Sequence, residues 1–149
     1  MFQLEKITPE LIQEFSRLIQ LHFNEIAHYP DIPLDPDFNR YSALDHSGVL
    51  RVFTIREEGK LLGYSIFVVG PNLHYKSSKQ AVQDILYLDP EKRGRLVGYQ
   101  FIKWCDEQLK VEEVQVVYHH IKANYDFGPM LERIGYELID KIYGRRLDR

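Results

Sequence analysis

The chain has little cysteine, and this limits the chemistry that it can support. Its one cysteine, Cys105, excludes an internal disulfide and any cysteine-rich zinc site. Because Cys105 lies in a stretch with helical apolar periodicity, we interpret it as a buried helix residue rather than as a nucleophile.

The sequence also lacks a long apolar run. No stretch approaches the roughly 20 residues that span a bilayer. The first residues, MFQLEKITPE, contain no basic segment followed by an apolar one, so we expect no signal peptide. These absences predict a protein of the cytoplasm with no membrane partner.

Charge of one sign is not concentrated anywhere in the chain. The formal net charge is −3 and no long basic or acidic run occurs, so the overall balance does not support a nucleic-acid partner. With 149 residues, of which 44% are hydrophobic, the chain has enough apolar material for the core of one compact domain spanning residues 1–149.

Apolar periodicity and turn residues predict an order of strand, helix, hairpin with a third strand, helix, strand, helix and strand. Thr8 and Pro9 mark the first helix start, and Leu11, Phe15, Leu18 and His22 lie on one line along that helix. We therefore expect one α/β domain around a mixed sheet. The expected strands are 2–7, 50–55, 61–69, 81–88, 114–121 and 136–147, and the expected later helices are 38–44, 95–110 and 126–134.

The segment from Tyr29 to Gly48 is rich in proline and aspartate. Asp31, Asp35 and Asp37 are residues of the type that binds a cation. Prolines separate them, however, and the glycine-centred pattern of calcium loops is missing, so we interpret them as solvated loop acids.

The most informative stretch is Asp84 to Gly98, DILYLDPEKRGRLVG. It predicts a strand that enters a basic, glycine-containing turn and then a helix. Free N–H groups at a helix N-terminus suit a phosphate or pyrophosphate, and Lys92, Arg93 and Arg95 add positive charge. The spacing matches neither common nucleotide-binding loop. A plain strand–turn–helix with solvated charges explains the same residues.

This stretch resembles the fourth strand and following loop of the GNAT acyltransferases. The family motif there is Q/R-x-x-G-x-G/A, whose backbone amides hold the pyrophosphate of coenzyme A. Arg93 matches the first position and Gly98 the last, while Leu96 replaces the middle glycine. The resemblance implies an acetyl-CoA site formed by the following residues: Leu86, Tyr87, Leu88, Arg93, Gly94, Arg95, Leu96, Val97 and Gly98.

A second match supports the resemblance. In the family an asparagine after the fifth strand precedes a Gly-aromatic pair by eleven residues, and Asn124 stands at that spacing before Gly135-Tyr136. The element order agrees over nearly the whole chain. The fold so implied is α/β (α+β), with a mostly antiparallel sheet of about six to seven strands and about four helices. The DFGPMLERIGY segment also resembles acetyltransferase-like proteins of phages and prophages.

The resemblance implies transfer of an acyl group from coenzyme A to an amine. The family stabilises the oxyanion with a backbone N–H of the fourth strand, which corresponds here to Tyr87 or Leu88. Two side chains that many members use for proton transfer are absent. Leu131 stands where a tyrosine acid is common, and Gln83 where a glutamate is frequent.

Three other residues are candidates for proton transfer: Asp84, His120 and Tyr125. Asp84 is an acid within an apolar strand, where burial raises a carboxyl pKa, but it fits equally an edge position facing water. His120 has the side-chain type that titrates near neutral pH. Tyr125 adjoins Asn124, although packing is the alternative role. His119 faces away from His120 on a strand, so the pair cannot chelate a metal, and we expect none.

Three functions compete. The first is an N-acyltransferase that uses acetyl-CoA and an amine acceptor, either a small molecule or a protein. The second is a binding or regulatory module that keeps the fold without turnover, which Leu131, Gln83 and Leu96 favour. The third is a partner-binding protein whose last strand pairs with a second copy. Tyr136 and Tyr143 near the C-terminus permit such a homodimer.

Charge reversal tests the placement of the pyrophosphate. Replacing Arg93 and Arg95 with glutamate is expected to weaken coenzyme A binding markedly, because it puts negative charge beside the phosphates. Calorimetric titration measures the affinity. Unchanged affinity would show that the pyrophosphate binds elsewhere.

Overall fold

Local signals in the sequence set the helix ends. The Thr8 hydroxyl accepts a hydrogen bond from the N–H of Leu11 at 3.1 Å, and an Asp37 carboxylate oxygen accepts from the N–H of Arg40 at 2.9 Å. Both are N-cap contacts that satisfy a free donor of the first helical turn. Gly135 ends the last helix with a φ of +119°, a conformation that side chains other than glycine disfavour.

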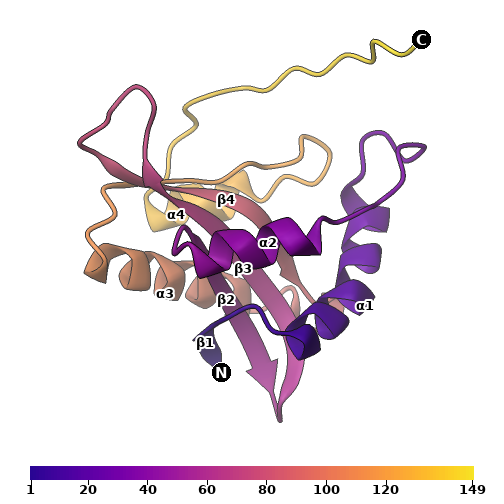
Figure 1. Cartoon of the computed structure of the whole chain (residues 1–149), viewed down its shortest axis with the longest axis horizontal. Helices are drawn as coiled ribbons and strands as arrows, with labels where there is room; N and C mark the ends of the chain where they lie inside the picture. The colour runs from indigo at the N-terminus through magenta and orange to yellow at the C-terminus, as the bar shows by residue number, and fades with distance from the viewer.

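The computed structural model describes residues 1–149 and contains five strands and four α-helices (Figure 1). In chain order, the elements are β1 (Phe2–Glu5), α1 (Pro9–Ile26), α2 (Phe38–His46), β2 (Leu50–Glu57), β3 (Lys60–Pro71), β4 (Lys79–Leu88), α3 (Val97–Val111), β5 (Val116–Tyr118) and α4 (Gly128–Ile134), with a short 3₁₀ turn at Pro90–Lys92 before α3.

The sheet has the order β1-β2-β3-β4-β5. The first four strands are antiparallel to their neighbours, and β5 alone pairs in parallel, with β4. The mixed, mostly antiparallel sheet expected from the sequence is therefore confirmed.

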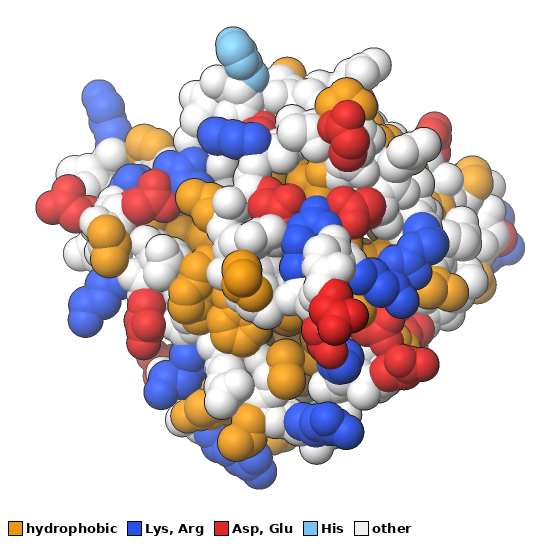
Figure 2. Space-filling view, turned by 90° about the horizontal axis from the view of Figure 1, so that it is seen from below, with side chains coloured by type: hydrophobic (Ala, Val, Ile, Leu, Met, Phe, Trp, Pro, Cys, Tyr) orange, Lys and Arg blue, Asp and Glu red, His pale blue; other side chains and the backbone are white.

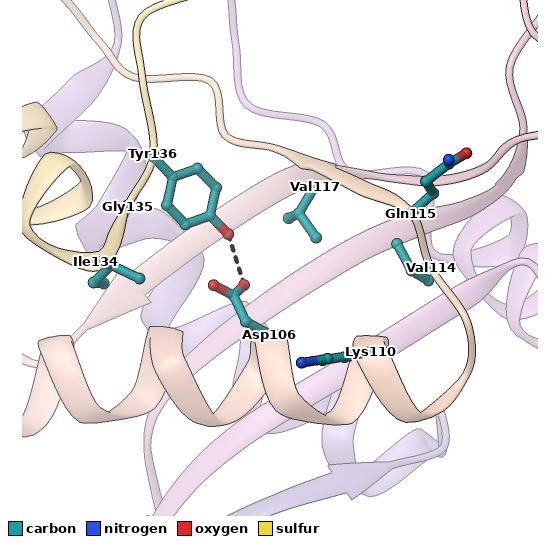
Figure 3. A pocket seen from close by; sticks show the side chains of 8 residues that line it. All are labelled: Asp106, Lys110, Val114, Gln115, Val117, Ile134, Gly135 and Tyr136. Carbon is teal, nitrogen blue, oxygen red and sulfur yellow. Dashed lines mark hydrogen bonds between the residues drawn. The ribbon is translucent and has the colours of Figure 1, made fainter.

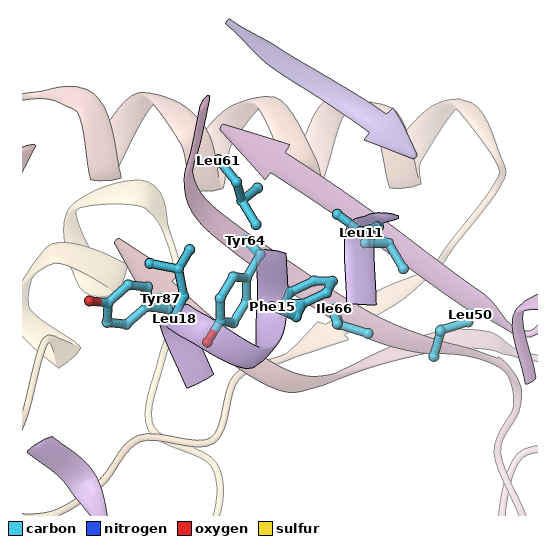
Figure 4. Packing of buried hydrophobic residues seen from close by; sticks show 9 residues of the cluster. Leu11, Phe15, Leu18, Leu50, Leu61, Tyr64, Ile66 and Tyr87 are labelled. Carbon is cyan, nitrogen blue, oxygen red and sulfur yellow. The ribbon is translucent and has the colours of Figure 1, made fainter. Parts of the chain in front are cut away.

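Each face of the sheet has its own hydrophobic core. On the face covered by α1 and α2, the α1 side chains of Leu11, Phe15 and Leu18 pack on the sheet around Tyr64 and Tyr87 (Figure 4). On the opposite face, α3 contributes its apolar stripe, which includes Cys105 at 1% exposure. The interpretation of Cys105 as a buried helix residue is thus confirmed, and burial raises the pKa of its thiol. The side chains of Leu11, Phe15, Leu18 and His22, which the sequence placed on one line along the first helix, are buried.

The strand count is lower than the expected six to seven. Residues 136–147 form no strand, and the fifth strand is limited to Val116–Tyr118 instead of 114–121. In both cases the cause is the lack of a neighbour. Strand-forming residues adopt a ladder only against a partner, and β4 leaves β5 after Val82. His120 consequently lies beyond the strand on which the sequence placed it.

Charges of both signs are interspersed over the surface seen in Figure 2, with apolar side chains between them. No helix combines the length and the hydropathy that crossing a membrane requires. No group of three or more histidine, cysteine, aspartate or glutamate side chains is placed to hold a metal ion.

Two histidines are enclosed by the cores. His22 of α1 points into the core, with its Nδ1 3.2 Å from the Tyr64 hydroxyl, and His119 contacts the rings of Phe67 and Tyr136. Both ring nitrogens of His119 are buried without a hydrogen-bond partner. Burial lowers the pKa of each imidazole from 6.5 to about 4, because it disfavours the charged ring.

This burial predicts a loss of stability in mild acid. Between pH 6.5 and about 4 the unfolded chain binds protons at His22 and His119 that the folded chain does not, so the free energy of unfolding falls as the pH falls through this window. The slope is up to about 1.4 kcal/mol per pH unit for each histidine. In urea denaturation series, His119→Gln is expected to make the slope shallower, whereas the exposed neighbour substitution His120→Gln keeps the parental slope. Equal slopes for all three proteins would contradict the assignment.

Candidate functional site

The sheet opens where β4 and β5 separate. The two strands pair only from Gln80 with Val116 to Val82 with Tyr118. Next to this point β4 carries a bulge, because Ile66 of β3 pairs with Ile85 and the next residue of β3 pairs with Gln83, so that Asp84 is the extra residue. Beyond the bulge, β4 continues to Leu88 with a neighbour on one side only. One edge of its backbone faces an opening in the sheet.

The direction of the backbone groups in this half of β4 follows from its contacts. Asp89 donates its N–H to the carbonyl of Leu62 at 2.7 Å, which is on the β3 side. Since the direction alternates along a strand, Tyr87 also faces β3, and the N–H groups of Leu86 and Leu88 point into the opening. The carbonyl of Leu88 does so too, since it accepts a hydrogen bond from Arg93 Nε at 2.7 Å. Of the two backbone groups named for oxyanion stabilisation, that of Leu88 therefore faces the opening.

The loop after β4 presents a continuous row of unpaired backbone donors. No N–H from Gly94 to Tyr99 has an acceptor within the chain. Leu96 is the N-cap of α3 and gives no side-chain cap, in contrast to Thr8 and Asp37 at the starts of α1 and α2. Such a row at the positive end of a helix dipole is suited to a phosphate or pyrophosphate.

The two glycines of this loop have different roles. Gly94 has a φ of +77° and open space around it, so it is required for backbone conformation rather than for close approach. At Gly98 an added Cβ would lie 3.6 Å from Leu88 Cδ2, an ordinary contact. Close packing against a neighbouring part of the chain therefore does not require glycine at either position.

The basic side chains of the loop are not equally available. Lys92 pairs with Glu57 at 2.8 Å, and Arg93 pairs with Glu25 at 2.9 Å. Arg95 is exposed and has no ion-pair partner. It is therefore the basic residue whose charge is free for a ligand at the loop, and Arg95→Glu alone is the cleaner form of the charge-reversal test.

Arg93 connects three parts of the molecule at the opening. Its guanidinium donates to the Tyr125 hydroxyl at 2.6 Å and to Glu25 of α1, while its Nε binds the carbonyl of Leu88. It also lies over the rings of Tyr87 and Tyr125, with 5.4 and 5.7 Å to their centroids. Charge-assisted bonds of this kind are strong and directional. They hold the end of β4, the end of α1 and the β5–α4 loop together around the opening.

The three residues named for proton transfer do not form one cluster. Asp84 is exposed at the bulge of β4 and accepts a hydrogen bond from the Tyr41 hydroxyl of α2, whose pKa is raised by burial and by that carboxylate. His120 is exposed, and its backbone N–H donates to Gln83. Only Tyr125 is tied to the open end of β4, through Arg93. Of the two environments considered for Asp84, the exposed one is present.

Sequence reasoning missed the buried polar groups behind the opening. His22, Tyr64 and Tyr87 lie together, with Tyr64 and Tyr87 stacked at 5.5 Å between centroids. The Tyr87 hydroxyl is buried without a partner, and burial raises the pKa of this phenol. The position of His22 on the apolar stripe of α1 indicated burial but not a function. Nothing in the sequence pointed to Glu25, because its partner Arg93 lies 68 residues away and such a pair leaves no local pattern.

The acids of the α1–α2 segment mostly have structural partners. Asp31 pairs with an arginine of the C-terminal segment, Asp37 caps α2, and Asp45 accepts from the N–H of Ile7 at 2.7 Å. Asp35 alone has neither an ion pair nor a capping contact. The segment therefore does not form a cluster of free acids beside the opening.

Taken together, these backbone groups define a candidate site with two parts. At one end, unpaired N–H groups and Arg95 suit a diphosphate. Along β4, the free N–H groups of Leu86 and Leu88 suit an extended ligand that carries amide groups, in the manner of an added strand. Asn124 lies in the exposed turn before Tyr125, on the β5–α4 side of the opening.

A scan against protein-family models and a search of curated protein sequences find no match. Solved structures do match over nearly the full chain. A ribosomal-protein-alanine N-acetyltransferase from Brucella melitensis biovar Abortus 2308 has 16% identity and a TM-score of 0.71, with 99% of each chain covered. A predicted acetyltransferase with acetyl-CoA from Clostridium acetobutylicum has 12% identity and a TM-score of 0.70, covering 99% of this chain and 97% of that one.

A transcriptional regulator from Bacillus halodurans C-125 is also similar, with 12% identity, a TM-score of 0.77 and coverage of 99% of this chain and 100% of that one. The chain has the GNAT fold. At these identities the likeness concerns the fold alone, and one fold hosts several functions. The function must therefore be argued from the site.

Proposed function

We propose that the protein is an N-acyltransferase that transfers an acetyl group from acetyl-CoA to an amine. The observation that carries this proposal is the continuity of the open β4 edge with the row of free N–H groups from Gly94 to Tyr99. A diphosphate bound at that row, followed by an amide-containing arm along β4, has the chemical layout of coenzyme A. Few other ligands combine the two features.

Two groups of residues would bind the acetyl-CoA donor. The backbone of Gly94, Arg95, Leu96, Val97 and Gly98 would bind the pyrophosphate, with added charge from Arg95. The backbone of Leu86 and Leu88 would bind the arm, with Asn124 facing it from the β5–α4 side. Leu96 stands where the family motif has a glycine, and its N–H is free all the same, which is all that this binding mode requires of it.

When bound, acetyl-CoA supplies an acetyl group activated as a thioester. The free N–H of Leu88 or Leu86 is the candidate donor to the oxyanion that develops on the carbonyl. Positioning of the amine against that carbonyl supplies a large part of the rate. The acceptor would enter from the side of the α1–α2 segment and the β2–β3 hairpin.

Tyr125 is our candidate for the proton donor to the leaving thiolate. Its hydroxyl accepts a bond from Arg93, so its own proton is available to another group, and Arg93 fixes it beside the end of β4. Asp84 and His120 remain candidates for proton removal from the amine, and both are exposed to solvent that can carry the proton away. The phage-like subgroup and the cytoplasmic location remain predictions.

A second function is favoured by a specific observation. The similar structure of a transcriptional regulator, with Leu131 and Gln83 in place of common catalytic groups, supports a regulatory module that binds without turnover. The two proposals differ only in whether acetyl-CoA is consumed.

Titration followed by a turnover assay tests both. Calorimetry with acetyl-CoA, and separately with coenzyme A, is expected to give micromolar dissociation constants. Release of free coenzyme A thiol in the presence of a panel of small amines and peptides then reports transfer. Binding with no thiol release from any amine would favour the regulatory module. Absence of binding to the folded protein would refute both proposals.

The backbone conformation of the loop offers a matched pair of variants. Gly94→Ala is expected to weaken coenzyme A binding by roughly tenfold. A residue with a side chain costs roughly 1–2 kcal/mol in the left-handed conformation of Gly94, so the loop is expected to relax and turn its N–H groups away from the pyrophosphate. Gly98→Ala adds the same methyl group at a position with room and is expected to bind nearly as the parent does. Calorimetric titration measures both affinities. Equal affinities would mean that the N–H groups after Gly94 do not hold the pyrophosphate.

A further inference from the structure

The sheet face that carries α1 and α2 is not covered to its end. Val82 of β4 pairs with Val68 of β3, and Val68 pairs in turn with Leu50, which belongs to the core under these helices. Residues paired across adjacent strands share a face, so Val68 and Val82 lie on the face of α1 and α2. Val68 is nevertheless 41% exposed. On β5, Tyr118 pairs with Val82 and continues this uncovered face.

An open groove of about 890 Å³ lies over this end of the face. One side is formed by the first residues of β4 and β5, and the other by the β3–β4 loop, which projects beyond the sheet in Figure 1. Tyr75 of the loop and Tyr118 of β5 give the groove aromatic walls. Its volume is near the upper end of the range of roughly 300–1,000 Å³ for ligand pockets, so a ligand larger than a simple amine fits.

A polar group on the side of the groove has no partner. Gln80 is only 6% exposed and donates from its Nε2 to Ser78 Oγ at 3.1 Å, and Ser78 donates to Gln115 Oε1 at 2.6 Å. The hydroxyl proton of Ser78 is thereby used, and Gln80 Oε1 is buried without a hydrogen-bond partner. Buried acceptors are normally paired, so this one suits a ligand that offers an N–H.

Lys76 gives the groove a positive charge. None of the residues that line the groove is acidic, and Lys76 has no ion-pair partner in the chain. The next lysine, Lys79, is instead bound to the carbonyl of Glu112 at 2.7 Å. A free ammonium group without a neighbouring acid attracts an anion. The groove therefore suits a ligand that carries both amide groups and a carboxylate.

The other cavity of the protein lies on the opposite face of the sheet. It has a volume of about 390 Å³ and lies between α3 and the end of α4, with Val117 of the α3-side core on its wall (Figure 3). Its one acid, Asp106, already accepts a hydrogen bond from the Tyr136 hydroxyl at 2.6 Å. Lys110 lines this cavity and, like Lys76, has no ion pair. It offers a matched position for a control.

The groove and Asp84 share one face and one strand. The carboxylate of Asp84 accepts a hydrogen bond from Tyr41 of α2, which places it on the face of α1 and α2. Four steps along β4 separate Asp84 from Gln80, about 13 Å at the rise of a strand. An extended peptide covers this distance with roughly four residues.

We propose that the groove binds the acceptor, and that the acceptor is a peptide with a free amine beside Asp84 and a carboxylate at its fourth residue that pairs with Lys76. This inference rests on the proposed function, because it takes the amine to be the group that is acetylated. The amine nitrogen bonds to the acetyl carbon and loses one proton to Asp84 or water. The C–S bond breaks, and coenzyme A gains a proton and leaves as the thiol. Lys76 is then a specificity determinant, remote from the reacting atoms.

A matched set of peptides tests the charge preference. Three pentapeptide amides differ only at the fourth residue, which is glutamate, glutamine or lysine, and release of coenzyme A thiol gives kcat/KM for each. The glutamate peptide is expected to exceed the glutamine peptide about fivefold, as an exposed ion pair allows. The difference is expected in KM, because Lys76 acts on binding alone. In Lys76→Glu the lysine peptide is expected to become the best acceptor. Lys110→Glu, the same change on the opposite face, keeps the parental order.

The outcomes separate this inference from the proposed function. Equal kcat/KM for the three peptides would overturn the inference and leave the acyltransferase standing, and so would a parental order in Lys76→Glu. Where no peptide releases thiol, fluorescence anisotropy of the same peptides, labelled at the C-terminus, measures their binding instead. Tighter binding of the glutamate peptide that inverts in Lys76→Glu would then support the groove although transfer had failed. Equal binding of the three peptides, or binding of none, would overturn it.

Discussion

The separation of β4 from β5 is the constraint on which the rest of the structure depends. The two strands share only three residue pairs, and the bulge at Asp84 turns β4 away from its neighbour. A strand deep in a sheet would bond on both sides, whereas β4 from Ile85 onward bonds on one. This leaves backbone donors and an acceptor facing an opening that leads directly to the free N–H groups before α3. The proposed site consists chiefly of main chain, so a changed motif residue such as Leu96 leaves its backbone donors in place.

Arg93 fixes the positions of the elements that border the opening between β4 and β5. Its bonds reach Glu25 of α1, the carbonyl of Leu88 and the hydroxyl of Tyr125. From the motif alone its charge was expected to face a phosphate. The structure instead places that charge among protein partners, because a guanidinium that is only about a quarter exposed is most stable beside a carboxylate. Arg95, an exposed residue two positions later, has no such partner and is available to a ligand.

Unpaired main chain recurs at three places: the end of β4, the loop before α3 and the outer edge of β5. Buried polar groups of the backbone are nearly always paired in folded proteins, so a group that stays unpaired is directed to solvent or to a partner. The first two places are continuous with each other and form the proposed donor site. The third is the outer edge of the sheet, beside the apolar side chains of Val114, Val117 and Ile134.

The sequence by itself determined the local elements, the faces of the helices and the fold. Capping residues such as Thr8, the stripe ending at His22 and the element order are local patterns that depend on backbone chemistry and burial alone. The tertiary structure decided what depends on distant neighbours: the exposure of Asp84, the binding of Arg93 to Glu25, and the absence of a sixth strand after Tyr136. Local sequence could not predict these, because a strand forms only when another is beside it, and an ion pair across 68 residues leaves no periodic signal.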